Sequence, residues 1–326
     1  MFTNITADSL VDVNHAYRKI KKYWDIAGLV IKHESLYSKN GRPSVPIKQG
    51  FAMLFLQTLE DWSDRQMEQA LKDNVSVKWF CGYELTDKTP DHSYFGRLRE
   101  KLGTDNVSKI FNSIVEHLTR KGLCGNMFTF IDSTTMVSKV ATWKERDKAM
   151  KDGEDKLNND NINDYSSDKD ANYGCKGKNK FWFGFKRHHA VDMRHGIIKK
   201  VVVTKANVPD GKVLKNVCPK DGGMIFADKA YGGKDNRKEI KAKGCYDGGV
   251  IYKNNQKEKN RDKDRWATKV RMPFEGGFSK LRTATKYKGL VKTQYQALME
   301  ALVQNIKRSV KIMDLCDSQG VGLSGC

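Results

Sequence analysis

The spacing of apolar residues along the chain changes near residue 124. Before that point apolar residues recur every three or four positions, the period of an amphipathic helix. This spacing predicts helices at residues 48–59 and 65–72, another that begins after Ser93, and a fourth from Thr104 to Lys121. Gly122 follows the last of them as a glycine suited to a helix C-cap. Residues 1–122 are therefore expected to form an all-helical domain.

After residue 124 the apolar residues come in short continuous runs, which is the pattern of buried strands. Two of these runs end directly in an aspartate, Asp132 and Asp228. The strands predicted are residues 127–131, 181–192, 197–204, 224–227 and 248–252, and the helices are residues 213–217 and 236–243. The second and third strands are separated by a short turn and predict an antiparallel hairpin. This order of elements predicts a mixed α/β domain over residues 123–313.

Three segments lack such a pattern. Residues 150–170 hold seven acidic and three basic residues with many Asn and Ser, so a flexible insert is expected near residues 144–175. Residues 253–271 are expected to be a basic loop around Trp266, and residues 314–326 a disordered tail. Pro273 fits the first turn of a helix that follows the loop.

The positive charge of the chain is concentrated in one stretch. The formal net charge is +20 with a pI near 9.5, and residues 171–290 hold 30 Lys and Arg against 11 Asp and Glu. A field of this kind suits a polyanion, because each neutralised phosphate releases counterions. A basic surface that serves solubility is the alternative, although mixed Lys and Glu surfaces do that more commonly. Charge therefore favours a nucleic-acid partner.

Several classes of protein are disfavoured by missing motifs. Neither GxGxxG nor GxxxxGK[ST] occurs, so no dinucleotide-binding fold or P-loop is indicated. The histidines at 188, 189 and 195 lack an HExxH frame, which disfavours a zinc hydrolase. The seven Cys form no CxxC pair, so free thiols in a reducing cytoplasm are expected. The longest apolar run, residues 50–56, is too short to span a bilayer, and a soluble cytoplasmic protein is expected.

Asp132 and Asp228 are candidate metal ligands. Each ends an apolar run, where a charge is costly unless it is paired or bound to a metal. Small or polar residues follow both and would leave the carboxylates at an edge of the sheet. A turn or helix N-cap after a strand explains either aspartate equally well. Two such aspartates in one sheet shift the balance towards a metal site.

Glu275 is the third candidate. In a helix from Pro273, steps of three and four residues place Arg271, Glu275 and Arg282 along one face. The acid would bind a cation while the two Arg bind phosphate oxygens. An exposed helix with ordinary salt bridges gives the same pattern, and the adjacent Gly276 and Gly277 weaken the helix itself.

Taken together, these segments resemble bacterial insertion-sequence transposases of the IS5 group, within the DDE superfamily. The resemblance covers nearly the whole chain. The matching segments are 41–48, 61–64 and 90–93 in the helical part, 130–134 and 227–232 around the two aspartates, 174–178, 183–186 and 204–210 in the centre, and 271–282 around the glutamate. The family's usual Lys is Arg282 here, and its usual Tyr is Thr268. Arg282 keeps the positive charge of the family's Lys. Thr268 does not replace the Tyr, so that part of the glutamate signature is missing.

The resemblance implies a fold, an activity and a cofactor. The fold is an RNase H-like mixed five-stranded sheet with flanking helices, preceded by the all-helical domain. Asp132, Asp228 and Glu275 would hold Mg²⁺, with two ions expected and Mn²⁺ able to substitute. The enzyme would cut the ends of the element by hydrolysis and join them to target DNA by transesterification.

The basic residues are the candidate DNA contacts. Those expected in the catalytic domain are Lys176, Lys178, Lys180, Lys186, Arg187, Lys229, Arg271, Lys280 and Arg282, with Trp266 as a stacking or wedge residue. For Trp182, a stacking role and a position in the core are equally consistent with the sequence. In the helical domain, Arg42, Lys48, Arg97 and Arg99 are expected to recognise terminal repeats, which a helix-turn-helix could do.

Two other functions remain open. A DNA-binding protein derived from a transposase would keep end recognition without catalysis, but it has no reason to retain all three acids. A nuclease without strand transfer would use the same site, and only a strand-transfer assay separates the two enzymes. The partners expected are terminal inverted repeats, target DNA and a second copy of the chain, because two ends must be cut together. The expected location is the bacterial cytoplasm, in association with the nucleoid.

Overall fold

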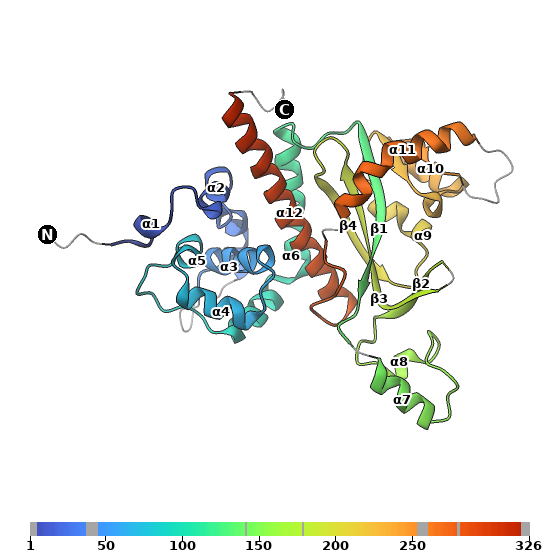
Figure 1. Cartoon of the computed structure of the whole chain (residues 1–326), viewed down its shortest axis with the longest axis horizontal. Coiled ribbons are helices and arrows are strands. Elements are labelled where there is room, and N and C mark those ends of the chain that lie inside the picture. The colour runs from blue at the N-terminus through green and yellow to red at the C-terminus, as the bar shows by residue number, and fades with distance from the viewer. Residues whose placement is uncertain are drawn as a thin grey trace. The chain divides into compact units, whose positions relative to one another are not determined.

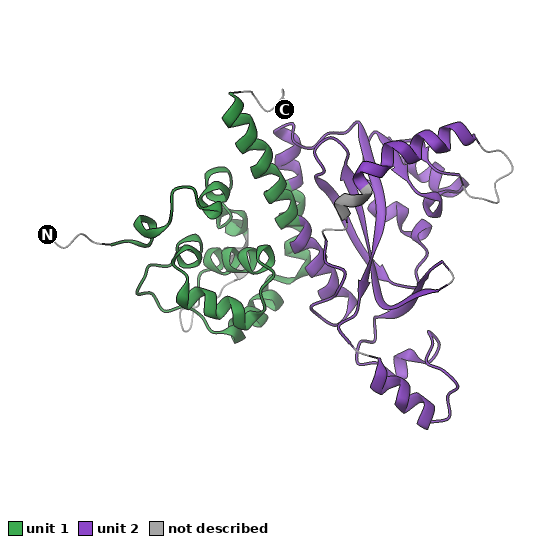
Figure 2. Cartoon of the chain, in the orientation of Figure 1, with its two compact units in different colours: residues 1–114, 302–326 green, residues 115–301 purple. Residues whose placement is uncertain are grey.

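The computed structural model describes residues 5–36, 45–140, 142–177, 179–252, 260–278 and 281–320, with the backbone only at 33–36 and 275–278. The chain divides into two compact units (Figure 2). Unit 1 contains Met1–Ile114 and Leu302–Cys326, and unit 2 contains Val115–Ala301. The division falls after Ile114 and after Ala301, where the sequence led us to expect boundaries at 122 and 313.

Unit 1 is helical, as expected. Its elements are α1 (Ala7–Leu10), α2 (Ala16–Tyr23), the 3-10 helix η1 (Gly28–Leu36), α3 (Ile47–Leu59), α4 (Asp64–Asp73), α5 (Val75–Phe80) and parts of α6 (His92–Arg120) and α12 (Leu290–Gln319). Ser63 and Gln66 form a reciprocal capping box at the start of α4. The two helices predicted after Ser93 follow one another in α6 across a kink at Gly103, whose φ is 68°.

The end of α12 is anchored in unit 1. Trp24 donates its indole N–H to Ser309 at 3.0 Å, and Lys19 and Lys22 pair with Asp314 and Asp317 at 2.7 and 2.6 Å. The expected disordered tail is thus wrong for residues 314–319, which continue the helix; residues 321–326 lie outside the described residues. Composition missed the last residues of this helix because their anchors are far away in the sequence.

Unit 2 is built on a mixed sheet of six strands in the part of the chain that is described. They are β1 (Phe128–Val137), β2 (Asn172–Lys176), β3 (Lys180–Asp192), β4 (Ile198–Lys205), β5 (Met224–Ala227) and β6 (Tyr246–Val250). The order is β2-β3-β1-β5-β6, with β4 also paired to β3. The pairs β1–β3, β2–β3 and β3–β4 are antiparallel, and β1–β5 and β5–β6 are parallel. The mixed α/β fold is confirmed.

The sixth strand is β2, which the sequence did not predict. It pairs with residues 180–184 of β3, whereas β4 pairs with residues 185–191. The two strands therefore pair with consecutive parts of β3. Short, polar and glycine-containing, β2 has no apolar run to mark it. At Gly184, with φ +150°, an added Cβ would lie 2.2 Å from the carbonyl oxygen of Met136, so β1 and β3 approach too closely there for any side chain.

Helices cover both faces of the sheet (Figure 1). On one face, α9 (Asp210–Val217) and α10 (Lys234–Ala242) enclose a buried cluster. This cluster includes Ile131, Ala190, Leu214, Val217, Ile225, Tyr231 and Ile240. On the other, α11 (Arg261–Phe278) packs against β1, β5 and β6. Gln294 of α12 bonds the backbone of β4 at Val203 and Val201, at 2.7 and 3.2 Å. The part of β1 that pairs with β5 consequently lies between two helical layers.

Two helices form within the insert expected near residues 144–175. Residues 143–151 and 162–165 form α7 (Trp143–Lys151) and α8 (Ile162–Tyr165), with Ala149 and Ile162 fully buried. Asp168 is buried and accepts bonds from the hydroxyl of Ser138 and the amide of Gly289, both at 3.1 Å. Order here rests on polar side chains that satisfy backbone groups, which a count of apolar residues does not detect.

The helix that carries Glu275 begins earlier than expected. Residues 261–271, predicted as a loop, are already helical, and Pro273 lies inside α11 rather than at its start. Trp266 packs on Phe226 of β5 with ring centroids 5.5 Å apart, and Ala267 is buried. These contacts with the sheet outweigh the basic composition of the segment. Residues 253–259 of the expected loop lie outside the described residues.

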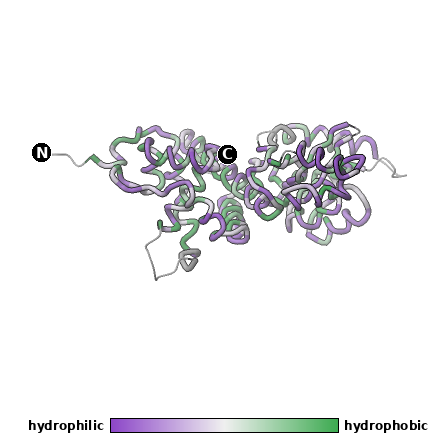
Figure 3. Tube along the Cα trace, turned by 90° about the horizontal axis from the view of Figure 1, so that it is seen from below, coloured by the Kyte–Doolittle hydropathy of each residue, from purple (hydrophilic) through white to green (hydrophobic). Residues whose placement is uncertain are grey.

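Hydrophilic and hydrophobic residues alternate along the trace of both units (Figure 3). Within the described ranges, no helix is both long and apolar enough to cross a membrane.

Candidate active site

Two carboxylates lie side by side where β1 and β5 run in parallel. Ile131 of β1 is paired with Ala227, the last residue of β5. Asp132 is the next residue of β1, and Asp228 directly follows the end of β5. Asp228 also caps the 3-10 helix η2 (Lys229–Tyr231), accepting the amide of Ala230 at 2.8 Å. The N-cap interpretation is therefore confirmed for Asp228. The cap uses one carboxylate oxygen of Asp228, and the residue still lies next to Asp132, so a cap and a metal site are compatible.

The surroundings of Asp132 disfavour its ionised form. Burial and, to a smaller extent, the neighbouring charge of Asp228 raise the pKa of Asp132 to about 6, although the amide of Ser133 and the charges of Arg271 and Lys176 lower it. The cations nearby therefore only partly compensate the ionised pair. A divalent cation prefers carboxylate oxygens and would supply the missing positive charge. The donor set fits a metal of this class.

Helix α11 brings a cation and the third candidate to the same face of β1. The Arg271 guanidinium lies 5.9 Å from the ring centroid of Phe130, which shares its face of β1 with Asp132. The backbone of Glu275 follows Arg271 by one helical turn and so lies on the same side of α11. Among the described side chains, no group of three His, Cys, Asp or Glu is placed to hold a metal ion. The Glu275 side chain is not among them, so its role remains a prediction.

Arg187 corrects one predicted DNA contact. Its side chain is fully buried, pairs with Glu300 of α12, and donates to the carbonyl of Arg282 at 2.9 Å. A buried guanidinium cannot reach a DNA phosphate, so the prediction for Arg187 is wrong. Periodicity places position 187 on one face of β3, but it does not reveal that an acid from a distant helix neutralises it.

The other predicted contacts are distributed around the sheet. Lys176, Lys180 and Lys229 are exposed, and Lys186 is paired with Asp210 at 2.6 Å. Trp182 is partly buried and donates to the carbonyl of Phe185 at 3.1 Å, which favours its place in the core. Trp266 is 46 % exposed, but it lies on a helix rather than in a loop. The predictions for Lys178, Lys280 and Arg42 lie outside the described residues.

A second polar cluster beside the two aspartates was not predicted as a site. Asp210 accepts bonds from Ser133 at 2.9 Å and Lys186 at 2.6 Å. Next to it, His188 contacts the hydroxyls of Tyr231 at 3.0 Å and Thr204 at 3.1 Å. The signal for Asp210 was its position at the end of the segment 204–210, but only its proximity to Ser133 indicates a role.

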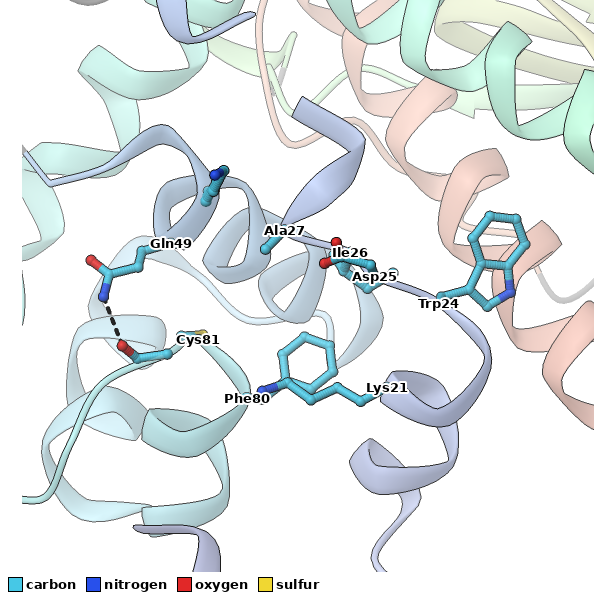
Figure 4. A pocket seen from close by; sticks show the side chains of 10 residues that line it. Lys21, Trp24, Asp25, Ile26, Ala27, Gln49, Phe80 and Cys81 are labelled. Carbon is cyan, nitrogen blue, oxygen red and sulfur yellow. Dashed lines mark hydrogen bonds between the residues drawn. The ribbon is translucent and has the colours of Figure 1, made fainter. Parts of the chain in front are cut away.

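In unit 1, Lys48 lines a pocket of about 510 Å³ (Figure 4). Lys21, Trp24 and Phe80 contribute to its wall, and Gln49 donates to the carbonyl of Gly82 at 2.7 Å. Arg97 is exposed. Arg99 instead forms a bidentate ion pair with Asp64 at 2.8 and 2.6 Å, so its guanidinium takes part in the packing of the helices.

Two family models match the chain. Residues 125–308 match the family model described as Transposase DDE domain, and residues 5–101 match Transposase domain (DUF772). The first match spans more than half of the chain, so the protein belongs to the DDE transposase family, of the insertion-sequence type. The family implies a metal-dependent enzyme that binds DNA.

Among solved structures, the chain is similar to one titled as the crystal structure of a pre-cleavage Mos1 transpososome. The match has 8% sequence identity and a TM-score of 0.17, and it covers 84% of this chain and 81% of that one. At that TM-score the likeness carries no argument about the fold.

Proposed function

We propose that the protein is a transposase of the IS5 group that cuts the ends of an insertion sequence and joins them to target DNA. Asp132, Asp228 and Glu275 are its catalytic acids. The observation that carries this proposal is the adjacency of Asp132 and Asp228 on parallel strands, with the pKa of Asp132 raised to about 6. The family match makes a transposase the first expectation for such a pair.

The order of the strands supports an RNase H-like core. Without β2, the order is β4-β3-β1-β5-β6, with the first three strands antiparallel and the last two parallel to β1. In a sheet of that kind the first acid lies on the central strand and the second at the end of the parallel neighbour. Asp132 and Asp228 occupy those positions, and β2 is an addition to the five-stranded core.

Two Mg²⁺ ions, for which Mn²⁺ would substitute, are the cofactor that suits these acids. Bound there, they would activate a water or a 3′-hydroxyl for in-line attack on a phosphodiester and stabilise the leaving oxygen. The chain's own residues orient the reaction. The amide of Ser133 fixes one oxygen of Asp132, η2 fixes Asp228, and Arg271 brings a cation that can bind a phosphate oxygen.

The DNA would be held by the exposed lysines around the sheet and by unit 1. Lys176 lies close enough to Asp132 to lower its pKa, so a backbone phosphate bound to Lys176 would be near the site of cleavage. Lys48 and Arg97 of unit 1 are the candidates for contacts with the terminal repeats. A homodimer on paired ends is part of this proposal.

Cleavage of DNA that carries the element's inverted repeats tests the proposal. Labelled duplex is incubated with the full chain in Mg²⁺ or in EDTA, with Glu275→Gln and Asp262→Asn run in parallel. Asp262 is the matched control, because it lies on the same helix with a side chain 93% exposed. We expect nicking and strand transfer in Mg²⁺, loss of both in Glu275→Gln, and full activity in Asp262→Asn. Nicking without strand transfer would indicate a nuclease, and binding without metal-dependent nicking a DNA-binding protein.

Arg97 and Arg99 are expected to differ sharply when each is replaced by Ala. Arg97→Ala should weaken DNA binding and leave stability unchanged, because the side chain is exposed. Arg99→Ala should lower the free energy of unfolding by about 1–2 kcal/mol, because Asp64 loses a charged partner in a partly buried site. Fluorescence anisotropy and urea denaturation measure the two effects. An Arg99→Ala protein of normal stability that binds DNA as weakly as Arg97→Ala would contradict the assignment.

A further inference from the structure

We propose that Asp210, in the first turn of α9, is a positioning residue that sets the spacing of Asp132 and Asp228 for a divalent cation. This inference rests on the metal site of the proposed function. It assigns a role to an acid that ligates nothing itself, because Lys186 already neutralises its charge at 2.6 Å.

One contact of α9 reaches the first aspartate through its neighbour. Asp210 accepts the hydroxyl of Ser133 at 2.9 Å, and the backbone amide of Ser133 donates to Asp132 at 2.8 Å. Ser133 is thus held at its side chain while its amide orients the Asp132 carboxylate. The pair formed by Asp210 and Lys186 is largely buried, with 18% and 14% of the side chains exposed, so the Asp210 carboxylate that binds Ser133 is held in place.

The next residue of α9 reaches the second aspartate. A Cβ added to Gly211 would lie 2.9 Å from the carbonyl oxygen of Ala230, so α9 approaches η2 closely at this point. The amide of Ala230 is the group that binds Asp228 at 2.8 Å. Two consecutive residues of α9 therefore contact the two residues whose amides orient the metal-binding candidates.

The charges of the same three acids act on the buried side chain of Tyr231. Burial raises the pKa of Tyr231 well above its usual value, and the charges of Asp210, Asp132 and Asp228 raise it further. Asp210 is therefore part of the electrostatic environment of the site rather than of a separate structural cluster.

Mn²⁺ binding to the full chain in the absence of DNA tests this role, measured by electron paramagnetic resonance. We expect Asp210→Asn to weaken Mn²⁺ binding by about tenfold or more, as loss of groups that orient metal ligands does. Ser133→Ala should act in the same direction, and Ser133→Thr, which keeps the hydroxyl, should retain wild-type affinity. Asp235→Asn is the matched control, since Asp235 is an exposed acid in the first turn of α10.

The Asp132→Asn protein separates the two proposals. If Asp132→Asn abolishes Mn²⁺ binding while folded Asp210→Asn and Ser133→Ala proteins bind normally, the positioning role is overturned and the proposed function stands. If the wild type and Asp132→Asn bind Mn²⁺ alike, the metal site and the positioning role both fail. Should Asp210→Asn not fold, the comparison of Ser133→Ala with Ser133→Thr decides, because neither changes a charge.

Discussion

Replacing Asp132 by Asn is expected to reduce DNA cleavage by at least about a thousandfold, because one ligand of the proposed metal site is lost without a change in shape. DNA binding should persist, since the amide keeps its place on β1 and the lysines around the sheet are untouched. Gel analysis of cleaved strands and anisotropy of the bound duplex measure the two properties separately. Cleavage within tenfold of the wild type would exclude Asp132 from the catalytic centre.

The same substitution is expected to stabilise the metal-free protein. Because the pKa of Asp132 is about 6 in the folded protein against 3.8 for an ordinary Asp, its ionised form destabilises the fold above pH 6. This penalty shrinks as the pH falls from 6 towards 4, where the carboxyl is protonated in the folded state. Asp132→Asn in EDTA should thus melt at a higher temperature than the wild type at pH 8, with a smaller difference at pH 5. A lower melting temperature for the variant at pH 8 would contradict this assignment of the shift.

Arg187→Met is expected to lower the free energy of unfolding by about 3–5 kcal/mol, because it leaves the partly buried Glu300 without its cation. The double variant Arg187→Met/Glu300→Met should recover much of the loss, since two apolar side chains replace a desolvated ion pair. Urea denaturation of the two single variants and the double variant gives the coupling energy. Lys180→Met, an exposed position on the same strand, is the control and should change stability little. A loss below 1 kcal/mol in Arg187→Met would show that the pair is not a structural element.

Local patterns in the sequence were sufficient to predict the framework of the site. The run 224–227 forms β5, and the run 127–131 supplies the first part of β1, which continues through Asp132 to Val137. The two aspartates come together because the strands before them are parallel neighbours. The predicted hairpin appears as β3 and β4. These features depend on residues close in sequence. Apolar residues that alternate indicate a strand buried on one face, and continuous apolar residues indicate a strand buried on both.

Features that depend on distant partners were not predictable in this way. Arg187 looked like a DNA contact because its partner Glu300 lies on another helix. Residues 261–271 looked like a loop because the contact of Trp266 with Phe226 is not visible in the local sequence. Asp210 was noticed only as part of a motif, since its role depends on Ser133 of a different strand.

The anchoring of α12 in unit 1 has a consequence for the order in which the protein is made. The strands of the sheet and residues 290–301 leave the ribosome before residues 302–319, which supply Ser309, Asp314 and Asp317 to unit 1. Domains fold as units during synthesis. The sheet is therefore complete while unit 1 still lacks a helix, and a chain whose translation stops before Leu302 carries both aspartates together with an unfinished helical unit.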